Sequence, residues 1–170
     1  MASNELKQHI KKWEGVKKNP YLDVAGVPTI GVGFTTYLDG TKVTMQDPPL
    51  DEIQIDRILD QKLNEFSRGV KTILGSELLA VMPQQSVDAL ISFAYNLGCG
   101  NLQKSTLLKK IRADKNDLPA IKAEFMKWVY AGGKVVKGLQ RRREDEFEMY
   151  LQGILSQYTK RELIKMYMGI

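Results

Sequence analysis

The sequence predicts an α+β fold that is mainly helical, in which a small lobe with β-hairpins is joined by a long helix to a helical lobe. Two patterns carry this expectation. Through most of the chain, apolar residues recur at spacings of three and four, as they do on one face of a helix. Residues 19–46 differ, because short β-branched runs alternate there with glycines, a pattern typical of strands and turns.

The N-terminal segment, residues 4–14, is expected to form the first helix. Leu6 and Ile10 fall on one face of it, and Gly15 is a suitable stop. Glu14 would then end this helix, where the negative end of the helix dipole disfavours a charged carboxylate. The position therefore suits a carboxyl group that must hold a proton.

The glycine-rich stretch is expected to contain two or three short antiparallel strands. Asp39-Gly40 lies between the runs VPTIGVGF and TKVTM, and this dipeptide is a strong hairpin signal. Pro48-Pro49 should end the stretch, and Asp51 can cap the helix that follows.

The rest of the chain is predicted to be helical. A linking helix is expected over about 51–74, ending at Gly75. Pro83 is expected to open a helix, Ser105 or Thr106 to cap a short one, and Asp117 to cap another that breaks at Gly132-Gly133. A further helix is expected over about 138–152, and the Thr159/Glu162 capping box precedes the last one. Cys99, between two glycines, is expected in a loop.

We interpret residues 1–170 as one domain with two lobes. The first lobe covers about 13–50, and the helical lobe covers about 76–170 together with the N-terminal helix. A length of 170 residues and a hydrophobic content of 43% suffice for a core without disulfides.

Composition excludes several kinds of protein. With one cysteine and one histidine, Cys99 and His9, the chain offers no disulfide, metal site or cofactor ligand set. The N-terminus is too polar for a signal peptide, and no run of 18 apolar residues exists, so we expect no membrane insertion. The net charge of +5 favours a polyanionic partner, but no nucleic-acid-binding motif is present.

The residues that carry chemistry lie in the segment WEGVKKNPYLDVAGVPTIGVGF. Glu14, Asp23 and Thr29 follow the spacing E-x8-D-x5-T, which places a helix end beside a hairpin. A glycosidase needs one protonated carboxyl to donate to the leaving oxygen and one charged carboxylate. Spacing alone is weak evidence, since two acids and a threonine are common on solvated surfaces.

The surrounding motif is more specific. E-G-x5-Y-x-D-x2-G-x-x-T-I-G-x-G, followed by QQSVDALISFAYNLGCGNLQKSTLLKKI and WVYAGGKVVKGLQRRREDE, resembles the phage lysozyme (endolysin) family, glycoside hydrolase family 24. The resemblance runs from residue 10 to about 151. It implies a lysozyme-like fold and a muramidase that cleaves the β-1,4 bond between N-acetylmuramic acid and N-acetylglucosamine.

Carried over from the family, Glu14 is the general acid, Asp23 assists the attacking water, and Thr29 lies in the site. Inversion is the expected outcome of such a water-mediated route. Three alternatives stay open: a lytic transglycosylase, a catalytically dead wall-binding module, and a basic helical nucleic-acid binder. The presence of both Asp23 and Thr29 argues against the first, and retention of both carboxylates argues against the second.

The resemblance also implies substrate contacts. Thr35, Tyr95, Ser105 and Arg142 match cleft positions of the family. Among the three arginines at 141–143, one is expected to reach Glu14, and the other two are expected to form surface ion pairs.

One departure concerns Phe34. Many relatives carry a histidine there that can contact the catalytic aspartate.

The resemblance also suggests partners. Peptidoglycan is the expected substrate and the chain is expected to be a monomer. It would be made in the host cytoplasm and would need a holin or another release factor to reach the cell wall.

Overall fold

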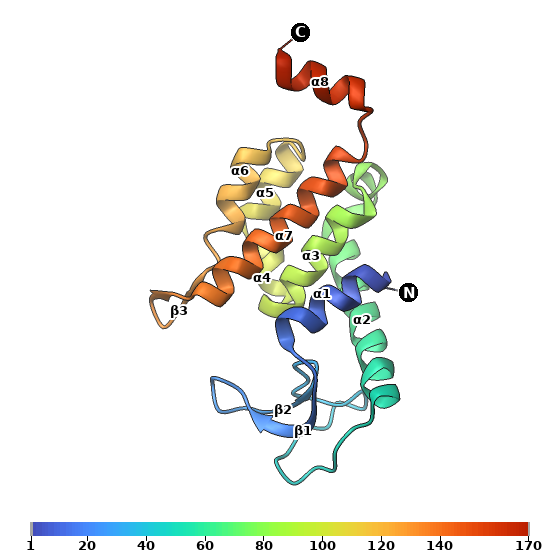
Figure 1. The fold of residues 1–170 in the computed structure, drawn as a ribbon, viewed down its shortest axis with the longest axis vertical. Helices are drawn as coiled ribbons and strands as arrows, with labels where there is room; N and C mark the ends of the chain where they lie inside the picture. The colour runs from blue at the N-terminus through green and yellow to red at the C-terminus, as the bar shows by residue number, and fades with distance from the viewer. Residues whose placement is uncertain (1, 170) are drawn as a thin grey trace. The chain divides into compact units, whose positions relative to one another are not determined.

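The structure is a computed structural model that describes residues 2–169, and it is mainly helical with two small β-hairpins (Figure 1). The strands are β1 Lys17–Leu22, β2 Pro28–Gly31, β3 Tyr130–Ala131 and β4 Lys134–Val135. The helices are α1 Asn4–Glu14, α2 Glu52–Val81, α3 Gln84–Leu97, α4 Cys99–Lys104, α5 Thr106–Ala113, α6 Leu118–Phe125, α7 Lys137–Leu155 and α8 Lys160–Met168. The predicted α+β, mainly helical fold class is confirmed.

The chain divides into two compact units, Met1–Glu65 and Phe66–Ile170. The boundary falls within α2, the helix predicted to link two lobes. By its contacts α1 belongs to the first unit, whereas the sequence analysis assigned it to the helical lobe. That 1–170 acts as one domain stays a prediction.

Helix α1 forms as its sequence predicts. The Ser3 hydroxyl accepts a hydrogen bond from the backbone N–H of Leu6 at 3.1 Å and caps the first turn. Leu6 and Ile10 are fully buried. Gly15 ends the helix at φ 73°, a left-handed conformation that favours glycine. Glu14 is therefore the last residue of a well-defined helix.

The regular strand pairing in the first unit lies earlier in the chain than expected. β1 and β2 are antiparallel, with Tyr21 opposite Thr29. The hairpin predicted at Asp39-Gly40 contributes only one isolated bridge, between Thr36 and Lys42. Two backbone bonds flank this bridge, from the Tyr37 N–H to the Thr41 carbonyl at 2.9 Å and from the Val43 N–H to the Thr35 carbonyl at 3.0 Å. The Asp39 carboxylate adds bonds from the backbone N–H of Thr41 at 2.9 Å and from its hydroxyl at 2.7 Å.

Helix α2 begins with the cap that the sequence indicates. The Asp51 carboxylate accepts from the backbone N–H of Gln54 at 2.7 Å. Gly75, expected to end the helix, interrupts it instead, since φ 79° and ψ 161° depart from helical values and the helix then continues to Val81. The linking helix is thus longer than predicted and kinked.

In the second unit α3 and α7 pack closely. The Ser86 hydroxyl donates to the carbonyl of Tyr150 at 2.7 Å, in the interior. A Cβ added at Gly153 would come within 2.6 Å of the Ser86 backbone nitrogen, so this contact requires glycine on α7. The close approach fixes α7, which carries the arginine cluster described below, against α3.

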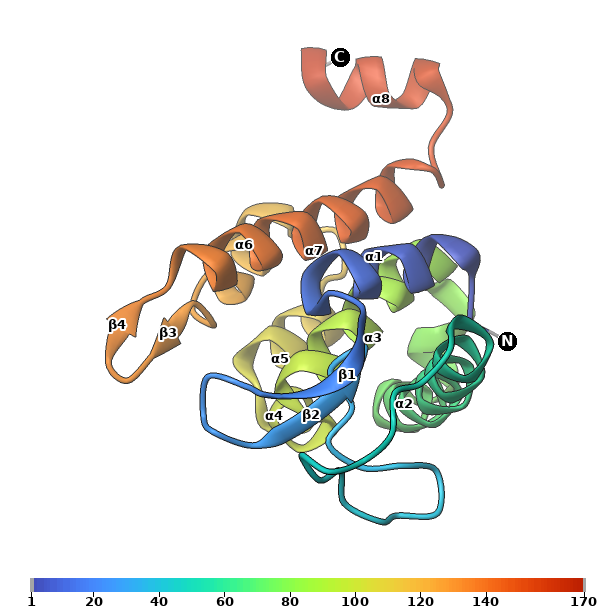
Figure 2. The same ribbon diagram turned by 60° about the horizontal axis from the view of Figure 1, so that its bottom comes forward.

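Three local predictions for the second unit are wrong. Helix α6 ends at Phe125, well before the break predicted at Gly132-Gly133. Gly132-Gly133 forms the turn of the β3–β4 hairpin (Figure 2) rather than breaking a helix. Cys99 starts α4 instead of lying in a loop. Among the described residues no helix has the length and apolar content needed to cross a bilayer.

Candidate active site

The carboxyl group of Glu14 packs against the loop that follows β2. A Cβ added at Gly33 would lie 2.8 Å from Glu14 Oε2, so the backbone of Gly33 is already in close contact with the carboxylate. Gly33 adopts φ 71°, which L side chains rarely adopt. Both the space and the backbone conformation at this position therefore require glycine.

The loop that carries Gly33 is tight. Ile30 and Phe34 exchange two backbone hydrogen bonds of 2.9 Å, which close a three-residue connection. Phe34 is 1% exposed, and a Cβ at Gly31 would meet its ring at 2.5 Å. At the position where many relatives carry histidine, this chain thus places a core residue that shapes the loop.

The carboxylate of Asp23 is fixed by the turn between β1 and β2. Its Oδ1 accepts from the backbone N–H groups of Ala25 and Val27, each at 2.9 Å. The backbone N–H of Asp23 donates to the carbonyl of Val27 at 3.0 Å. Three bonds therefore hold this turn and orient the Asp23 side chain.

Thr29 lies on β2 and is 2% exposed. Its hydroxyl donates to the carbonyl of Val27 at 2.8 Å. With its proton used in that bond, the Oγ1 oxygen can serve only as an acceptor toward any further group.

Tyr21 relates these residues to one another. Burial raises the pKa of the Tyr21 hydroxyl, and the nearby carboxylates of Glu14 and Asp23 raise it further. Tyr21 also pairs with Thr29 across the hairpin. Tyr21 therefore lies near both carboxyl groups and opposite Thr29; it matches the family motif but was not among the predicted site residues. Its place two residues before Asp23, on the strand facing Thr29, is the signal that would have found it.

The expected substrate contacts are more dispersed. In the first unit the side chain of Thr35 is exposed. In the second unit Tyr95 is half-buried on α3, its ring centroid 5.1 Å from that of Phe66. Ser105 is 4% exposed, and its hydroxyl donates to the carbonyl of Leu102 and accepts from the N–H of Leu108, so it caps a helix. Its hydroxyl is already used by the protein.

The arginines do not form the surface ion pairs expected for two of them. Arg142 is 4% exposed and Arg143 is fully buried, whereas Arg141 is exposed. Both buried guanidinium groups pair with Glu146, at 3.2 Å from Arg142 Nε and 2.8 Å from Arg143 Nε. Ser92 donates to the same carboxylate at 2.7 Å. Arg142, predicted to bind substrate, is thus part of an interior ionic cluster.

Burial raises the pKa of Glu146, and the charges of Arg143 and Arg142 partly oppose that shift. Arg143 also donates to the Asn96 side chain at 2.9 Å, and its guanidinium lies 5.2 Å from the centre of the Phe93 ring. The sequence shows three consecutive arginines but not that two of them are interior.

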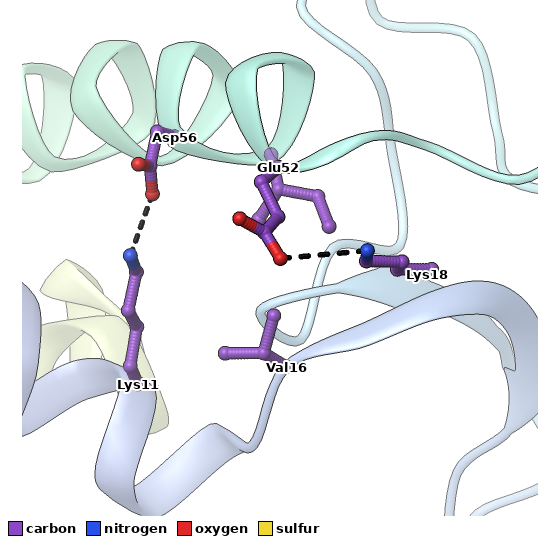
Figure 3. Close-up of a pocket in the computed structure, with 6 residues that line it drawn as sticks. Lys11, Val16, Lys18, Glu52 and Asp56 are labelled. Atoms are coloured by element: carbon purple, nitrogen blue, oxygen red, sulfur yellow. Dashed lines mark hydrogen bonds and ion pairs between the residues drawn. The ribbon is translucent and has the colours of Figure 1, made fainter.

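A pocket of about 310 Å³ lies in the first unit, and its lining does not include the predicted carboxylates (Figure 3). Figure 3 shows two ion pairs facing it, Lys11 with Asp56 at 2.6 Å and Lys18 with Glu52 at 3.4 Å. Its lining residues are Lys11, Val16, Lys18, Glu52, Ile55 and Asp56. It therefore belongs to the contact of α1 and β1 with the start of α2.

Comparison with known proteins identifies the class. The phage lysozyme family model matches residues 11–146. The SAR-endolysin of Bacteriophage PS119 is 36% identical over 140 residues, which cover 82% of this chain and 77% of that relative. The chain belongs to the phage lysozyme family.

Solved structures agree with this assignment. The endolysin of Escherichia coli phage FAHEc1 superposes with a TM-score of 0.76 at 29% identity, covering 89% of this chain and 93% of that one. A P22 lysozyme variant gives a TM-score of 0.72 at 26% identity, covering 89% and 98%. The protein is a glycoside hydrolase that degrades peptidoglycan.

Proposed function

We propose that the chain is a muramidase that hydrolyses the β-1,4 bond between N-acetylmuramic acid and N-acetylglucosamine, with Glu14 as general acid and Asp23 assisting a water. The observation that carries this proposal is that one hairpin holds both carboxyl groups: the loop after β2 contacts that of Glu14, and the turn between β1 and β2 orients that of Asp23. A glycosidase needs two such groups on either side of one bond.

The proposed reaction moves two protons. Glu14 donates its proton to the glycosidic oxygen as the bond from that oxygen to the sugar's anomeric carbon breaks. A water attacks the same carbon from the opposite face, and Asp23 accepts the proton that the water loses. The product then has the inverted configuration, as expected when water rather than a carboxylate is the nucleophile.

Thr29 suits a role in placing the water. Because its hydroxyl donates to the carbonyl of Val27, the oxygen is left as an acceptor for one water hydrogen. Asp23, oriented by the two backbone N–H groups of its turn, would accept the other. Two fixed acceptors would point a water lone pair toward the sugar.

Substrate contacts are part of the same proposal. Exposed Thr35 would donate to a sugar hydroxyl or acetamide group, and Tyr95 would pack against a sugar face. Arg142 and Ser105 would contribute mainly by fixing the local backbone and not by contacting the sugar, because their polar groups already bond to other residues of the protein. The protein would act as a monomer without cofactor.

The release route is also a proposal. Synthesis in the host cytoplasm would require a holin or other factor to bring the enzyme to the wall. The similarity to SAR-endolysins makes export across the membrane the competing route.

Product analysis tests the proposed chemistry. Proton NMR of muropeptides during digestion is expected to show the α-anomer first, followed by mutarotation. A β-anomer formed first would instead indicate a covalent glycosyl-enzyme. An anhydro-muramic product without a reducing end would identify a lytic transglycosylase.

A further inference from the structure

Helix α8 carries apolar side chains that the rest of the described chain leaves uncovered. None of its nine residues is buried, whereas α5, one residue shorter, buries three. The exposed fractions of its large apolar side chains are 49% for Ile164, 58% for Met166, 81% for Tyr167 and 68% for Met168. Single exposed apolar residues are common, but four on one short helix mark a surface for interaction.

The helix is nevertheless well defined at its ends. The Thr159 hydroxyl accepts from the N–H of Glu162 at 3.2 Å, and the Glu162 carboxylate accepts from the N–H of Thr159 at 2.7 Å. These two bonds form a capping box, and Gly169 closes the other end at φ 67°. Figures 1 and 2 show α8 following α7 after a short connection. Its side chains are therefore displayed in a fixed helical order.

That order places the apolar side chains together. Tyr167 and Met168 lie three and four residues after Ile164, so the three form one apolar stripe. Arg161 and Lys165, also four apart, border this stripe next to Met168, and Lys160 lies one turn before Ile164. With Lys160 and Glu162 included, the helix has three cationic residues and one anionic residue.

We propose that α8 is a membrane-surface element that lies on an anionic phospholipid bilayer, with its apolar stripe among the acyl chains and its cations at the headgroups. An apolar face bordered by lysine and arginine is the pattern of interfacial helices. Anionic headgroups complement the cations, whereas a second copy of α8 would bring like charges together. Nine residues are far short of the roughly 20 that span a bilayer, so the helix lies on the surface.

This surface is separate from the proposed chemistry. The family model ends at residue 146, before α8 begins. Bilayer binding and peptidoglycan hydrolysis can therefore be measured separately, and either one can be absent while the other is retained. A wall-degrading enzyme that also held a bilayer would be retained beside its substrate.

The test is sedimentation of the full chain with vesicles, either phosphatidylcholine alone or a mixture of phosphatidylcholine with phosphatidylglycerol. Binding is expected to be at least about tenfold tighter on the anionic mixture. The double variant Ile164→Gln/Met168→Gln, which keeps good helix formers, is expected to lose about tenfold in binding but to retain hydrolysis of purified sacculi. Ile53→Gln, at an 81% exposed position on α2, is the matched control and should bind like the parent.

A second pair of variants separates α8 from the overall charge. Arg161→Glu/Lys165→Glu and Lys109→Glu/Lys110→Glu each replace two exposed cations by anions, but the second pair lies on α5. Only the α8 variant is expected to lose most of its binding. Equal losses, or equal binding to both kinds of vesicle, would overturn the proposal. If the parent chain self-associated without binding vesicles, and the Gln double variant did not self-associate, the partner of α8 would be a second copy and the proposal would be overturned.

Discussion

At the scale of single residues, close contacts and hydrogen bonds hold the carboxyl groups of the candidate site in position. Gly33 touches the Glu14 carboxylate, and Asp23 is held by two N–H groups of its own turn. Tyr21 lies within the field of both acids. These contacts fix where each carboxyl group can point, which is the property that acid catalysis needs.

Gly33→Ala is expected to lower activity at least about tenfold, because the new methyl group would displace the Glu14 carboxylate. It should also cost about 1–2 kcal/mol in unfolding free energy, since alanine is strained at a positive φ. Gly40→Ala is the matched control: its φ is 84°, but nothing lies within 4 Å of the added Cβ. The control should lose similar stability and keep full activity. Equal activity of the two variants in a sacculus assay would contradict the contact.

The sequence predicts Glu14, Asp23 and Thr29 as site residues because their spacing matches the motif of the family that it resembles. It could not find the Gly33 contact, which depends on how a loop folds back on a helix end. It also misplaced Arg142 and Arg143, since a run of arginines beside acids looks the same whether it is solvated or buried. Only the packing of α7 against α3 determines whether these arginines are solvated or buried.

At the scale of elements, α1 is tied to α2 by ion pairs at matching intervals. Lys7 pairs with Asp60 at 2.5 Å and Lys11 with Asp56 at 2.6 Å, so residues four apart on one helix meet residues four apart on the other. The second pair lies three residues before Glu14. The ladder therefore holds the helix turn from which the proposed acid projects.

Asp56→Asn/Asp60→Asn is expected to reduce the unfolding free energy by about 1 kcal/mol at low ionic strength, and by less at about 1 M salt, where charges are screened. Urea denaturation at both salt concentrations measures this. Glu52→Gln serves as the control, because its pair with Lys18 is 3.4 Å long and both side chains are largely exposed. A loss in the double variant that is unchanged by salt would argue against the ionic ladder.

Elements were predictable where their signals are local. The caps of α2, α6 and α8 come from Asp51, Asp117 and Thr159, each of which bonds within three residues. The strand region was less predictable. Asp39-Gly40 does turn the chain, but only a single bridge forms beside that turn, and the regular strand pairing forms around the turn at Asp23.

At the scale of the whole molecule, the chain combines a basic surface with an interior ionic cluster. The net charge of +5 favours approach to the anionic cell wall. Charges inside the second unit have a different role: Arg142, Arg143 and Glu146 join α7 to α3 through Ser92 and Asn96. Removing Arg143 takes away one of the two cations that face the buried Glu146 carboxylate, together with the hydrogen bond to Asn96, in a medium of low polarity.

Arg143→Met is accordingly expected to lower the unfolding free energy by about 3–5 kcal/mol. Arg141→Met makes the same chemical change at the exposed neighbouring position and should alter stability by less than about 0.5 kcal/mol. Chemical denaturation of both proteins checks the difference. Similar midpoints for the two variants would show that the cluster does not stabilise the fold.

The measurement that tests the central claim most directly is the hydrolysis of purified sacculi by the parent chain and by Glu14→Gln, with circular dichroism and thermal unfolding as controls for folding. The amide keeps the size of the side chain but has no proton to donate to the leaving oxygen. We predict release of reducing sugar by the parent, and a loss of at least about a hundredfold in the variant, with unchanged unfolding. A folded Glu14→Gln protein that still hydrolyses sacculi at the parent rate would contradict the assignment of Glu14 as the general acid.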